Sequence, residues 1–426
     1  MTATQKSKKQ TTNEVNTDRL WADLMKIAEF TEPDAPYTRR VFSPLFKEAR
    51  KWLTERFQEA GLSTRLDTAG NLIGRLEGSD PACGTIMIGS HSDTVAGGGR
   101  FDGVAGVICA LEIARAIKEK GYKPRHNIEV VDFLGEEPNK FGLSCVGSRA
   151  MSAHLEDKML AYKDPSSGET LEQAIASIGG KPAQLKDSKR SDVKAFFELH
   201  IEQGPVLENE AIDIGIVTGI VGIRRIEIKF TGEADHAGTT PMHMRRDASQ
   251  ALAESILYIN KLAGELAEAG EGHFVATTGV AEITPNAANV VPGTSRLIID
   301  ARSESRPLME QFYAAVDAAT EKFAAERNVT RDGPHILSDT TPAICDAALQ
   351  GILRESAHSV GLSTRHMASG AGHDCAFVSR IAPSAMVFVP CKAGKSHAAN
   401  EWAEPDALAE GSSTIVRAII EFDQSF

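Results

Sequence analysis

Apolar residues recur every three or four positions in two segments near the start of the chain, residues 19–30 and 43–60. This spacing places them on one face of an α-helix, and Gly61 is a typical residue to end the second helix. We therefore predict two amphipathic helices here. Two strand-like runs follow them, at residues 62–67 and 71–77.

A strand–helix–strand alternation comes next. Residues 85–90 (TIMIGS) are almost continuously apolar, which is typical of a short strand buried on both faces of a sheet. Residues 104–120 follow as a long amphipathic helix that ends before Gly121, and residues 127–134 (NIEVVDFL) form another buried strand. The alternation predicts an α/β fold, with a mostly parallel central sheet flanked by helices.

The pattern changes between residues 215 and 331. It predicts, in order, strand 223–230, helix 247–269, strands 274–283 and 295–301, helix 305–327 and a last strand near 335–338. Such a βαββαβ order is typical of a ferredoxin-like α+β unit, which can fold alone. We therefore predict an inserted domain at 215–331 that divides a first domain into two parts, 18–214 and 332–426. Apolar stripes on the two inserted helices suggest a homodimer formed through this domain.

Length and charge narrow the possible functions. A chain of 426 residues is expected to form two or three domains. Its 46 basic and 58 acidic residues give a formal charge of −12. Binding to nucleic acid or to an anionic membrane surface needs the opposite sign of charge, so neither is expected as a partner.

The cysteines and the polar N-terminal segment indicate a location. Residues 1–17 lack the apolar core of a secretory signal, so we predict a disordered tail there. No apolar run approaches the roughly 20 residues that span a bilayer. The six cysteines show no C-x-x-C spacing and are expected to be reduced thiols. We therefore expect a cytoplasmic protein without a membrane partner.

Imidazoles and carboxylates gather where the predicted strands end. In open α/β sheets, ligands bind at the carboxyl ends of the strands. The candidates at or beside such ends are His91, Asp102 after a glycine-rich loop, the adjacent Glu136 and Glu137, His200, and His397 in the loop after residues 385–389. Each is weak alone, because a single His is usually structural and Asp102 could simply cap the next helix. Together, in this order, they are hard to produce by chance.

These residue types fit a site for two divalent ions. Two ions about 3.5–4 Å apart need one bridging carboxylate, with His and carboxylate ligands on each. Neighbours at a strand end point to opposite sides, so the adjacent pair Glu136 and Glu137 can supply one ligand and one general base.

Several long motifs resemble one known family. They are GSHSDTVAGGGRFDGVAGV, GEEPNKFG, ELHIEQGPVLE, DHAGTTPMHMRRDA, PNAANVVPG, SGAGHDC and GKSHAANEW. They are similar to the zinc-dependent N-carbamoyl-L-amino-acid hydrolases, a family that also holds allantoate and ureidoglycolate amidohydrolases and β-ureidopropionase. These are dinuclear-metal amidases of the aminoacylase-carboxypeptidase superfamily. The resemblance covers nearly the whole chain after Asp18 and implies a zinc-peptidase-like catalytic domain with an inserted lid and dimerisation domain.

The resemblance also implies a role for each candidate. It assigns His91 and His200 to one metal, Glu137 and His397 to the other, Asp102 to the bridge between them and Glu136 to the general base for a metal-bridged hydroxide. The ions are expected to be zinc, although manganese, cobalt and nickel also suit nitrogen and oxygen ligands. Asp93 is expected to orient the His91 imidazole as a hydrogen-bonding neighbour.

The substrate residues follow from the same resemblance. His236 is expected to polarise the scissile carbonyl oxygen, and Arg302 to clamp a substrate carboxylate with its bidentate fork. The remaining candidates are Gln203 and Asn289 as partners for carboxylate or ureido groups, and the backbone at Gly370, Ala371 and Gly372 for close approach to the substrate. His373 and Asp374 are expected to brace the site.

The predicted function is therefore hydrolysis of a C–N bond in a ureido group or linear amide of a small carboxylate substrate. N-carbamoyl-L-amino acids, allantoate and ureidoglycolate are the expected substrates. Pro138, Cys391, Lys395 and the sequence SHAANE depart from the family's usual pattern and leave the exact substrate open. The alternatives are an N-acyl-amino-acid deacylase or dipeptidase of the same superfamily, a non-catalytic binding protein on this scaffold, and a fold analogue whose His and Glu are structural.

Overall fold

A computed structural model describes residues 13–270 and 272–425, which form two compact units. The first unit comprises the described residues up to Thr218, then Cys345–Met367, and the described residues from Ala371 onward. The second comprises Gly219–Ile344 with Ala368–Gly370. The chain therefore leaves the first unit and returns to it, as expected for an inserted domain.

The first unit is built on a mixed sheet with the strand order β1-β2-β4-β3-β5-β15-β6-β13, and β14 pairs with β6. The bounds are β1 (Ser63–Leu66), β2 (Leu72–Leu76), β3 (Thr85–His91), β4 (Asn127–Phe133), β5 (Val193–Ile201), β6 (Ile214–Ile220), β13 (Ala343–Ile344), β14 (Thr364–Ser369) and β15 (Ser384–Val389). The neighbours β4, β3, β5 and β15 run parallel, while β1, β2 and β6 pair antiparallel at the edges. The prediction of an α/β fold with a mostly parallel centre is confirmed.

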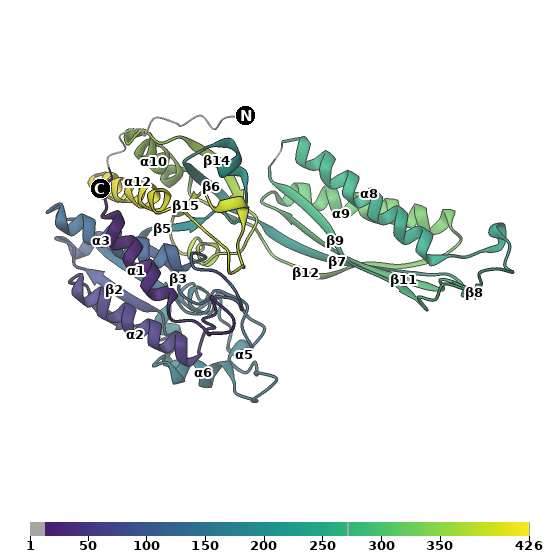
Figure 1. Cartoon of the computed structure of the whole chain (residues 1–426), viewed down its shortest axis with the longest axis horizontal. Coiled ribbons are helices and arrows are strands. Elements are labelled where there is room, and N and C mark those ends of the chain that lie inside the picture. The colour runs from purple at the N-terminus through teal and green to yellow at the C-terminus, as the bar shows by residue number, and fades with distance from the viewer. Residues whose placement is uncertain (1–12, 271, 426) are drawn as a thin grey trace. The chain divides into compact units, whose positions relative to one another are not determined.

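Helices cover both faces of this sheet. The bounds are α1 (Thr17–Ala28), α2 (Pro44–Glu59), α3 (Val104–Glu119), α4 (Val146–Met151), α5 (Asp157–Leu160), α6 (Leu171–Ser177), α7 (Val206–Glu210), α10 (Ala347–Ser359), α11 (Cys375–Val378) and α12 (Pro405–Gln424). Helices α1, α3, α10 and α12 share one apolar core with the sheet (Figure 1). Helices α4 and α11 contact strands of the same sheet. Every residue of β3 and β4 is buried as a result, which explains their continuous apolar sequence.

The first residues of the described chain are not a tail. Asn16 caps α1 by accepting a hydrogen bond from the backbone N–H of Arg19, and Glu14 forms ion pairs with Lys120 and Arg417. Val15 is buried in the apolar core. The predicted disordered tail at residues 1–17 is therefore wrong for residues 13–17, and residues 1–12 lie outside the described part.

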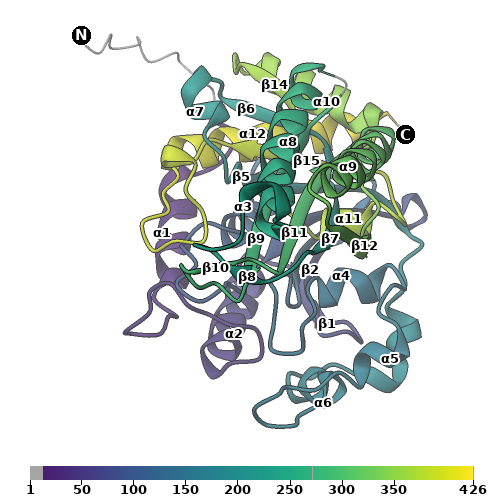
Figure 2. The same ribbon diagram turned by 90° about the vertical axis from the view of Figure 1, so that its right-hand side faces the viewer.

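The second unit has the predicted βαββαβ order. Its elements are β7 (Gly222–Thr231), β8 (Asp235–His236), α8 (Ala248–Glu268), β9 (Phe274–Thr284), β10 (Val290–Val291), β11 (Thr294–Ser303), α9 (Arg306–Glu326) and β12 (Thr330–Asp339). The sheet order is β12-β7-β11-β9, all antiparallel, and α8 and α9 lie side by side along one face of it (Figure 2). Short 3₁₀ turns complete the chain at Pro81–Cys83, Pro182–Ser188, Met242–Met244 and Lys392–Gly394.

The observed bounds of the second unit differ from the predicted 215–331. It begins at Gly219 and ends at Ile344. The difference at the far end arises because β12 pairs with β7 over much of its length, so the last strand belongs to the inserted sheet. Among the described residues, no helix is both long and apolar enough to cross a bilayer.

Candidate metal centre

The predicted ligands of the first unit meet at one edge of its sheet. Strand β3 ends at His91, and its parallel neighbour β5 carries His200 next to its last residue. The adjacent pair Glu136 and Glu137 follows strand β4, which is parallel to β3. Because parallel strands end at the same edge of a sheet, residues distant in sequence are brought together there.

Asp102 lies between two groups of possible ligands. Its Oδ1 is 3.2 Å from His200 Nε2 and 3.8 Å from His91 Nε2, whereas its Oδ2 is 3.2 Å from His397 Nε2. His397 Nε2 is also 3.3 Å from Glu137 Oε1. The ligand atoms of His91, Asp102 and His200 lie within 4.8 Å of one another, and so do those of Asp102, Glu137 and His397. One carboxylate is thus shared by two ligand sets, each facing a different oxygen.

The two buried imidazoles are oriented as metal ligands require. His91 Nδ1 lies 3.0 Å from the backbone oxygen of Asp93, and His200 Nδ1 lies 2.9 Å from that of Ile201. A backbone oxygen can only accept a hydrogen bond, so each Nδ1 carries a proton and Nε2 is the nitrogen left to bind a metal ion. In both rings Nε2 lies within 3.8 Å of Asp102 Oδ1, and His200 Nε2 also accepts a hydrogen bond from the Gly103 backbone N–H at 3.0 Å. This donor set fits a divalent ion.

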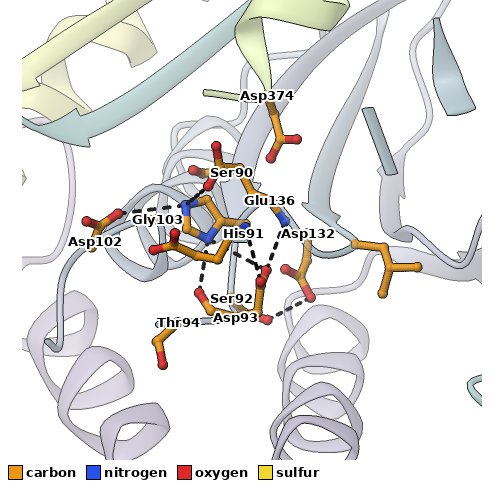
Figure 3. Close-up of polar contacts among 12 residues, drawn as sticks. Ser90, His91, Ser92, Asp93, Thr94, Asp102, Gly103, Asp132, Glu136 and Asp374 are labelled. Atoms are coloured by element: carbon orange, nitrogen blue, oxygen red, sulfur yellow. Dashed lines mark hydrogen bonds and ion pairs between the residues drawn. The ribbon is translucent and has the colours of Figure 1, made fainter. Parts of the chain in front are cut away.

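Asp93 connects the end of strand β3, which carries His91, to the loop that carries Glu136 and Glu137 (Figure 3). Its two carboxylate oxygens accept hydrogen bonds from the backbone N–H groups of Glu136 and Glu137, at 3.2 and 3.3 Å. The bond to His91 comes from the Asp93 backbone oxygen, while the carboxylate is 3.7 Å from Nδ1. Asp93 therefore contacts the predicted imidazole, but mainly through its backbone.

The centre carries an excess of buried negative charge. Asp93, Asp102, Glu136 and Glu137 are all buried, and in the described part of the chain no lysine or arginine forms an ion pair with any of them. Burial lowers the pKa of His91, but the surrounding carboxylates, Glu136 foremost, raise it well above its ordinary value. Buried carboxylates are costly without a counter-charge, so this cluster suits bound cations.

Glu136 lies beside His91 and next to Glu137 in the sequence, but it belongs to neither ligand set. Its Oε2 is 3.5 Å from His91 Nε2, and the Cys145 thiol donates to its Oε1 at 3.4 Å. Burial raises the pKa of Glu136 well above its ordinary value, and Glu137 adds to this effect. A carboxylate with a raised pKa is a suitable proton acceptor near neutral pH. A Cβ built on Gly372 would be 3.9 Å from Oε1, so the backbone passes close to this oxygen.

Comparison with known proteins identifies the family of this centre. Residues 87–421 match peptidase family M20/M25/M40. The chain belongs to this family. An N-carbamoyl-L-amino-acid amidohydrolase of Paenarthrobacter aurescens is 36% identical, with 97% of this chain and 100% of the relative covered. A ureidoglycolate hydrolase of Oryza sativa subsp. japonica is 35% identical, with 95% of this chain and 84% of the relative covered.

Solved structures of M20 relatives agree. The crystal structure of an amidase of the hydantoinase/carbamoylase family from Burkholderia multivorans matches with a TM-score of 0.88 and 32% identity, covering 96% of this chain and 98% of that one. The resemblance found in the motifs is therefore confirmed, as is the expectation of an amidohydrolase. The M20 family is metal-dependent, in agreement with the two ligand sets.

Gln203, a predicted partner for the substrate, also contacts the metal centre itself. Its Nε2 donates to Asp102 Oδ2 at 2.6 Å and to Ser396 Oγ at 3.3 Å. Its Oε1 is buried and has no hydrogen-bond partner among the described residues. Because an amide next to a carboxylate must present its nitrogen, the orientation of this side chain is determined. Gln203 therefore offers one unused acceptor beside the shared carboxylate of the M20 centre.

Most predicted substrate residues lie in the second unit. His236 is exposed and accepts a hydrogen bond at Nδ1 from Gly238 N–H; it is close to Asn289, whose backbone oxygen accepts from Ala237 N–H. Arg302 forms an ion pair with Asp300 at 2.7 Å and donates to the Gly370 backbone oxygen at 2.9 Å. The second unit thus brings together two pairs, while Ala371 belongs to the first unit. Their roles toward a substrate stay predictions.

Four residues that contact the centre were not singled out from the sequence as contributing to it. Ser396 and Glu401 lie beside Asp102, Cys145 contacts Glu136, and the buried Arg39 donates to the backbone oxygen of Ser92. Ser396 and Glu401 both stand in the family motif GKSHAANEW, which was the available signal. The predicted bracing residue His373 packs against His200, with 4.5 Å between ring centroids.

Proposed function

We propose that the chain is a dinuclear-metal hydrolase that cleaves the C–N bond of a ureido (N-carbamoyl) group in a small carboxylate substrate. The observation that carries the proposal is the pair of ligand sets sharing Asp102, with Glu136 beside His91 and belonging to neither set. When bound, the ions lower the pKa of the attacking water and polarise the scissile carbonyl. We propose zinc, because histidine and carboxylate ligands suit it.

Glu136 is the proposed general base. Its buried carboxylate takes a proton from the attacking water and then transfers it to the leaving nitrogen. The Cys145 thiol donates to Oε1, so Oε2, which faces His91, is the oxygen available to the water. The raised pKa of Glu136 favours holding the proton between these two steps.

Gln203 supports a ureido substrate over an N-acyl one. Its nitrogen is committed to Asp102, so its unused Oε1 can only accept a hydrogen bond. A terminal ureido NH₂ provides that donor, whereas an acetyl methyl or a substrate carboxylate does not. Leaving a buried acceptor unpaired costs about 1–3 kcal/mol, which would discriminate against N-acyl substrates. The names of the two relatives above also support this class of substrate.

The second unit is proposed to bind the rest of the substrate. Arg302 would hold the substrate carboxylate with its planar fork, Asn289 would assist it, and the backbone at Gly370 and Ala371 would pack against the substrate. His236 would donate to the oxyanion that forms as the carbonyl is attacked.

We also propose a homodimer through the second unit. All six cysteines are free thiols, which supports a cytoplasmic location.

A substrate panel tests the proposed function. Protein loaded with zinc is given N-carbamoyl-L-amino acids, allantoate, ureidoglycolate, N-acetyl amino acids and dipeptides. Ammonia release and amino-group release are measured separately. We expect ammonia from at least one ureido compound and much slower turnover of its N-acetyl counterpart. Faster cleavage of N-acetyl amino acids or dipeptides would favour a deacylase or dipeptidase, and no turnover in the panel would favour a binding protein.

A further inference from the structure

A closed ring of polar contacts surrounds the shared carboxylate of the metal centre. Glu401 is only 1% exposed, and its Oε1 accepts from the backbone N–H groups of Phe101 and Asp102 at 2.7 and 3.1 Å. The Ser396 hydroxyl lies between Glu401 Oε2, at 2.9 Å, and Asp102 Oδ2, at 2.5 Å, and its single proton is donated to one of these oxygens at a time. Asp102 is therefore held twice, at its backbone N–H and at its side chain.

This ring determines which way the Asp102 carboxylate faces. With its backbone tied to Glu401 and Oδ2 tied to Ser396, the remaining oxygen, Oδ1, is directed at His200, 3.2 Å away, and His91. Both oxygens are then placed for different ligand sets. The ring also joins the loop before α3 to the loop that carries His397, although the two are almost 300 residues apart.

The glycine-rich loop before Asp102 is shaped by the same contact. Gly99 has φ +144°, and a Cβ built on it would lie 2.4 Å from Glu401 Oε1. Gly97, two residues earlier, has nothing within 4 Å of its Cβ position. Gly99 is thus needed for the close approach of Glu401, because any side chain there would displace the carboxylate that holds Asp102.

We propose that Glu401 is a positioning residue for the dinuclear centre, acting through Ser396 and the Asp102 loop. This rests on the proposed function only in requiring that the two ligand sets bind metal. Hydrogen-bonded neighbours of metal ligands orient them, and their loss typically weakens metal binding by about 10–100-fold. Removal of Glu401 is expected to weaken the binding of both ions, because Asp102 belongs to both ligand sets.

The chain contains a matched control for a purely structural role. Asp423 is also 1% exposed, and its carboxylate accepts from two consecutive backbone N–H groups, those of Arg125 and His126, and from the Tyr122 hydroxyl. Like Glu401, Asp423 accepts from two consecutive backbone N–H groups and lies against a hydroxyl; it also contacts the His126 ring at 2.7 Å, and none of its hydrogen bonds with described residues involves a candidate ligand. Loss of Asp423 should destabilise the fold without changing metal binding.

The experiment measures zinc affinity of the full chain by competition with a chromophoric chelator, and the absorption spectrum of the cobalt-substituted protein. The variants are Glu401→Ala, Glu401→Gln, Ser396→Ala and Asp423→Ala, with thermal unfolding recorded for each. We expect Glu401→Ala to lower the affinity for both zinc ions by about 10–100-fold and to change the absorption spectrum of the cobalt-substituted protein. Glu401→Gln should stay within about threefold of wild type, because its amide oxygen accepts both N–H groups and its nitrogen donates to Ser396.

The Ser396→Ala variant keeps the test decisive if Glu401→Ala does not fold. Ser396→Ala removes only the hydroxyl on Oδ2 and should weaken mainly the ion held with Glu137 and His397, by about tenfold. Asp423→Ala should unfold at a lower temperature with unchanged affinities.

Wild-type affinity in Glu401→Ala or Ser396→Ala, or equal weakening in Asp423→Ala, would overturn the proposal. If the wild-type chain binds two ions but cleaves no ureido compound, the proposed function fails and the positioning role stands. A wild-type chain that binds no divalent ion would end both.

Discussion

At the scale of single residues, the centre depends on how each polar side chain uses its second polar atom. His91 and His200 place Nδ1 on backbone oxygens, which leaves Nε2 for a metal. Gln203 places its nitrogen on Asp102, which leaves its oxygen as an acceptor. A ligand or substrate contact is thus selected by a neighbouring hydrogen bond that the sequence does not display.

The Glu136→Gln variant tests the proposed base. Glutamine keeps the shape of the side chain but cannot take a proton, and Glu136 is outside both ligand sets. We expect kcat on the best ureido substrate to fall by about 10²–10⁴-fold while two ions stay bound. Steady-state kinetics and metal content of the same preparation check this. The Glu137→Gln variant should instead lose one ion, and a wild-type rate in Glu136→Gln would exclude Glu136 as the base.

The Gly103→Ala variant tests the space beside His91. Gly103 has φ +65°, and a Cβ there would lie 2.2 Å from the His91 ring. We expect the ring to be displaced and the ion held by His91, Asp102 and His200 to bind at least about tenfold more weakly. Gly97→Ala is the matched control, since Gly97 has φ +62° but nothing within 4 Å of its Cβ position. Equal zinc affinities in the two variants would show that backbone strain alone is at work.

At the scale of elements, the parallel strands β3, β4 and β5 bring the ligands to one edge, and the helices behind them supply rigidity. Helix α3 begins directly after Asp102 and is buried from Val104 to Ile117, so the loop that carries the shared carboxylate is anchored to the apolar core. Helix α12 packs on α3 and on α10. The stability of these helices therefore affects the geometry of the centre.

A carboxyl group on α12 gives this element a pH dependence. Burial raises the pKa of Glu410 to about 7, and the nearby Asp213 and Asp406 contribute. The folded chain therefore retains a proton that the unfolded chain releases, so this group's contribution to stability falls as the pH rises from about 4.5 to about 7. We expect Glu410→Gln to raise the free energy of unfolding by about 1–2 kcal/mol at pH 8 and by much less at pH 5.

Denaturant unfolding of Glu410→Gln and wild type at both pH values measures this difference. Glu421→Gln, at an exposed position of the same helix, serves as the control and should show no such change between the two pH values. A larger gain at pH 5 than at pH 8 would contradict the expected sign.

At the scale of the whole molecule, the described chain forms two compact units. The first unit holds both ligand sets, and the second holds His236, Asn289 and Arg302. In the proposed function, the first unit binds the metal ions and the second contributes residues that bind the substrate.

Metal removal should destabilise the whole chain. The buried carboxylates of the centre repel one another without a counter-charge, so the metal-free protein should unfold at a lower temperature than the zinc-loaded one. We expect two ions per chain at saturation, loss of activity after chelation, and recovery of both activity and unfolding temperature when zinc is returned. Elemental analysis with thermal unfolding measures this. A chelated protein with an unchanged unfolding temperature would contradict the role of this cluster as a metal centre.

Light scattering tests the proposed dimer. The chain mass is 45.7 kDa, so a dimer should have about twice that mass. Leu257 on α8 is 72% exposed, and Leu257→Glu is expected to shift the protein toward monomer. Leu66 in the first unit is 42% exposed, and Leu66→Glu should leave the assembly unchanged. A fully active wild-type monomer would remove the dimer from the proposal.

Much of this architecture follows from local sequence pattern. The apolar spacing predicted α1, α2, α3 and the buried strands β3 and β4, because helix and strand periodicity is a property of adjacent residues. The ligand candidates could be found because they lie at strand ends or in the loops that follow strands, and the ends of parallel strands in such folds converge. The long motifs then gave the family.

Tertiary structure decided what depends on contacts between distant residues. The last strand of the inserted unit was predicted, but only its pairing with β7 as far as Asp339 shows that the unit extends past residue 331. Residues 13–17 are held by hydrogen bonds to residues that lie about 100 and 400 positions further along the chain, which a local pattern cannot reveal. Glu401, Ser396 and the orientation of Gln203 are decided in the same way, since burial and hydrogen bonding depend on which side chains the fold places side by side. The sequence alone therefore determined the elements and the chemistry available, and the fold decided how each polar atom is used.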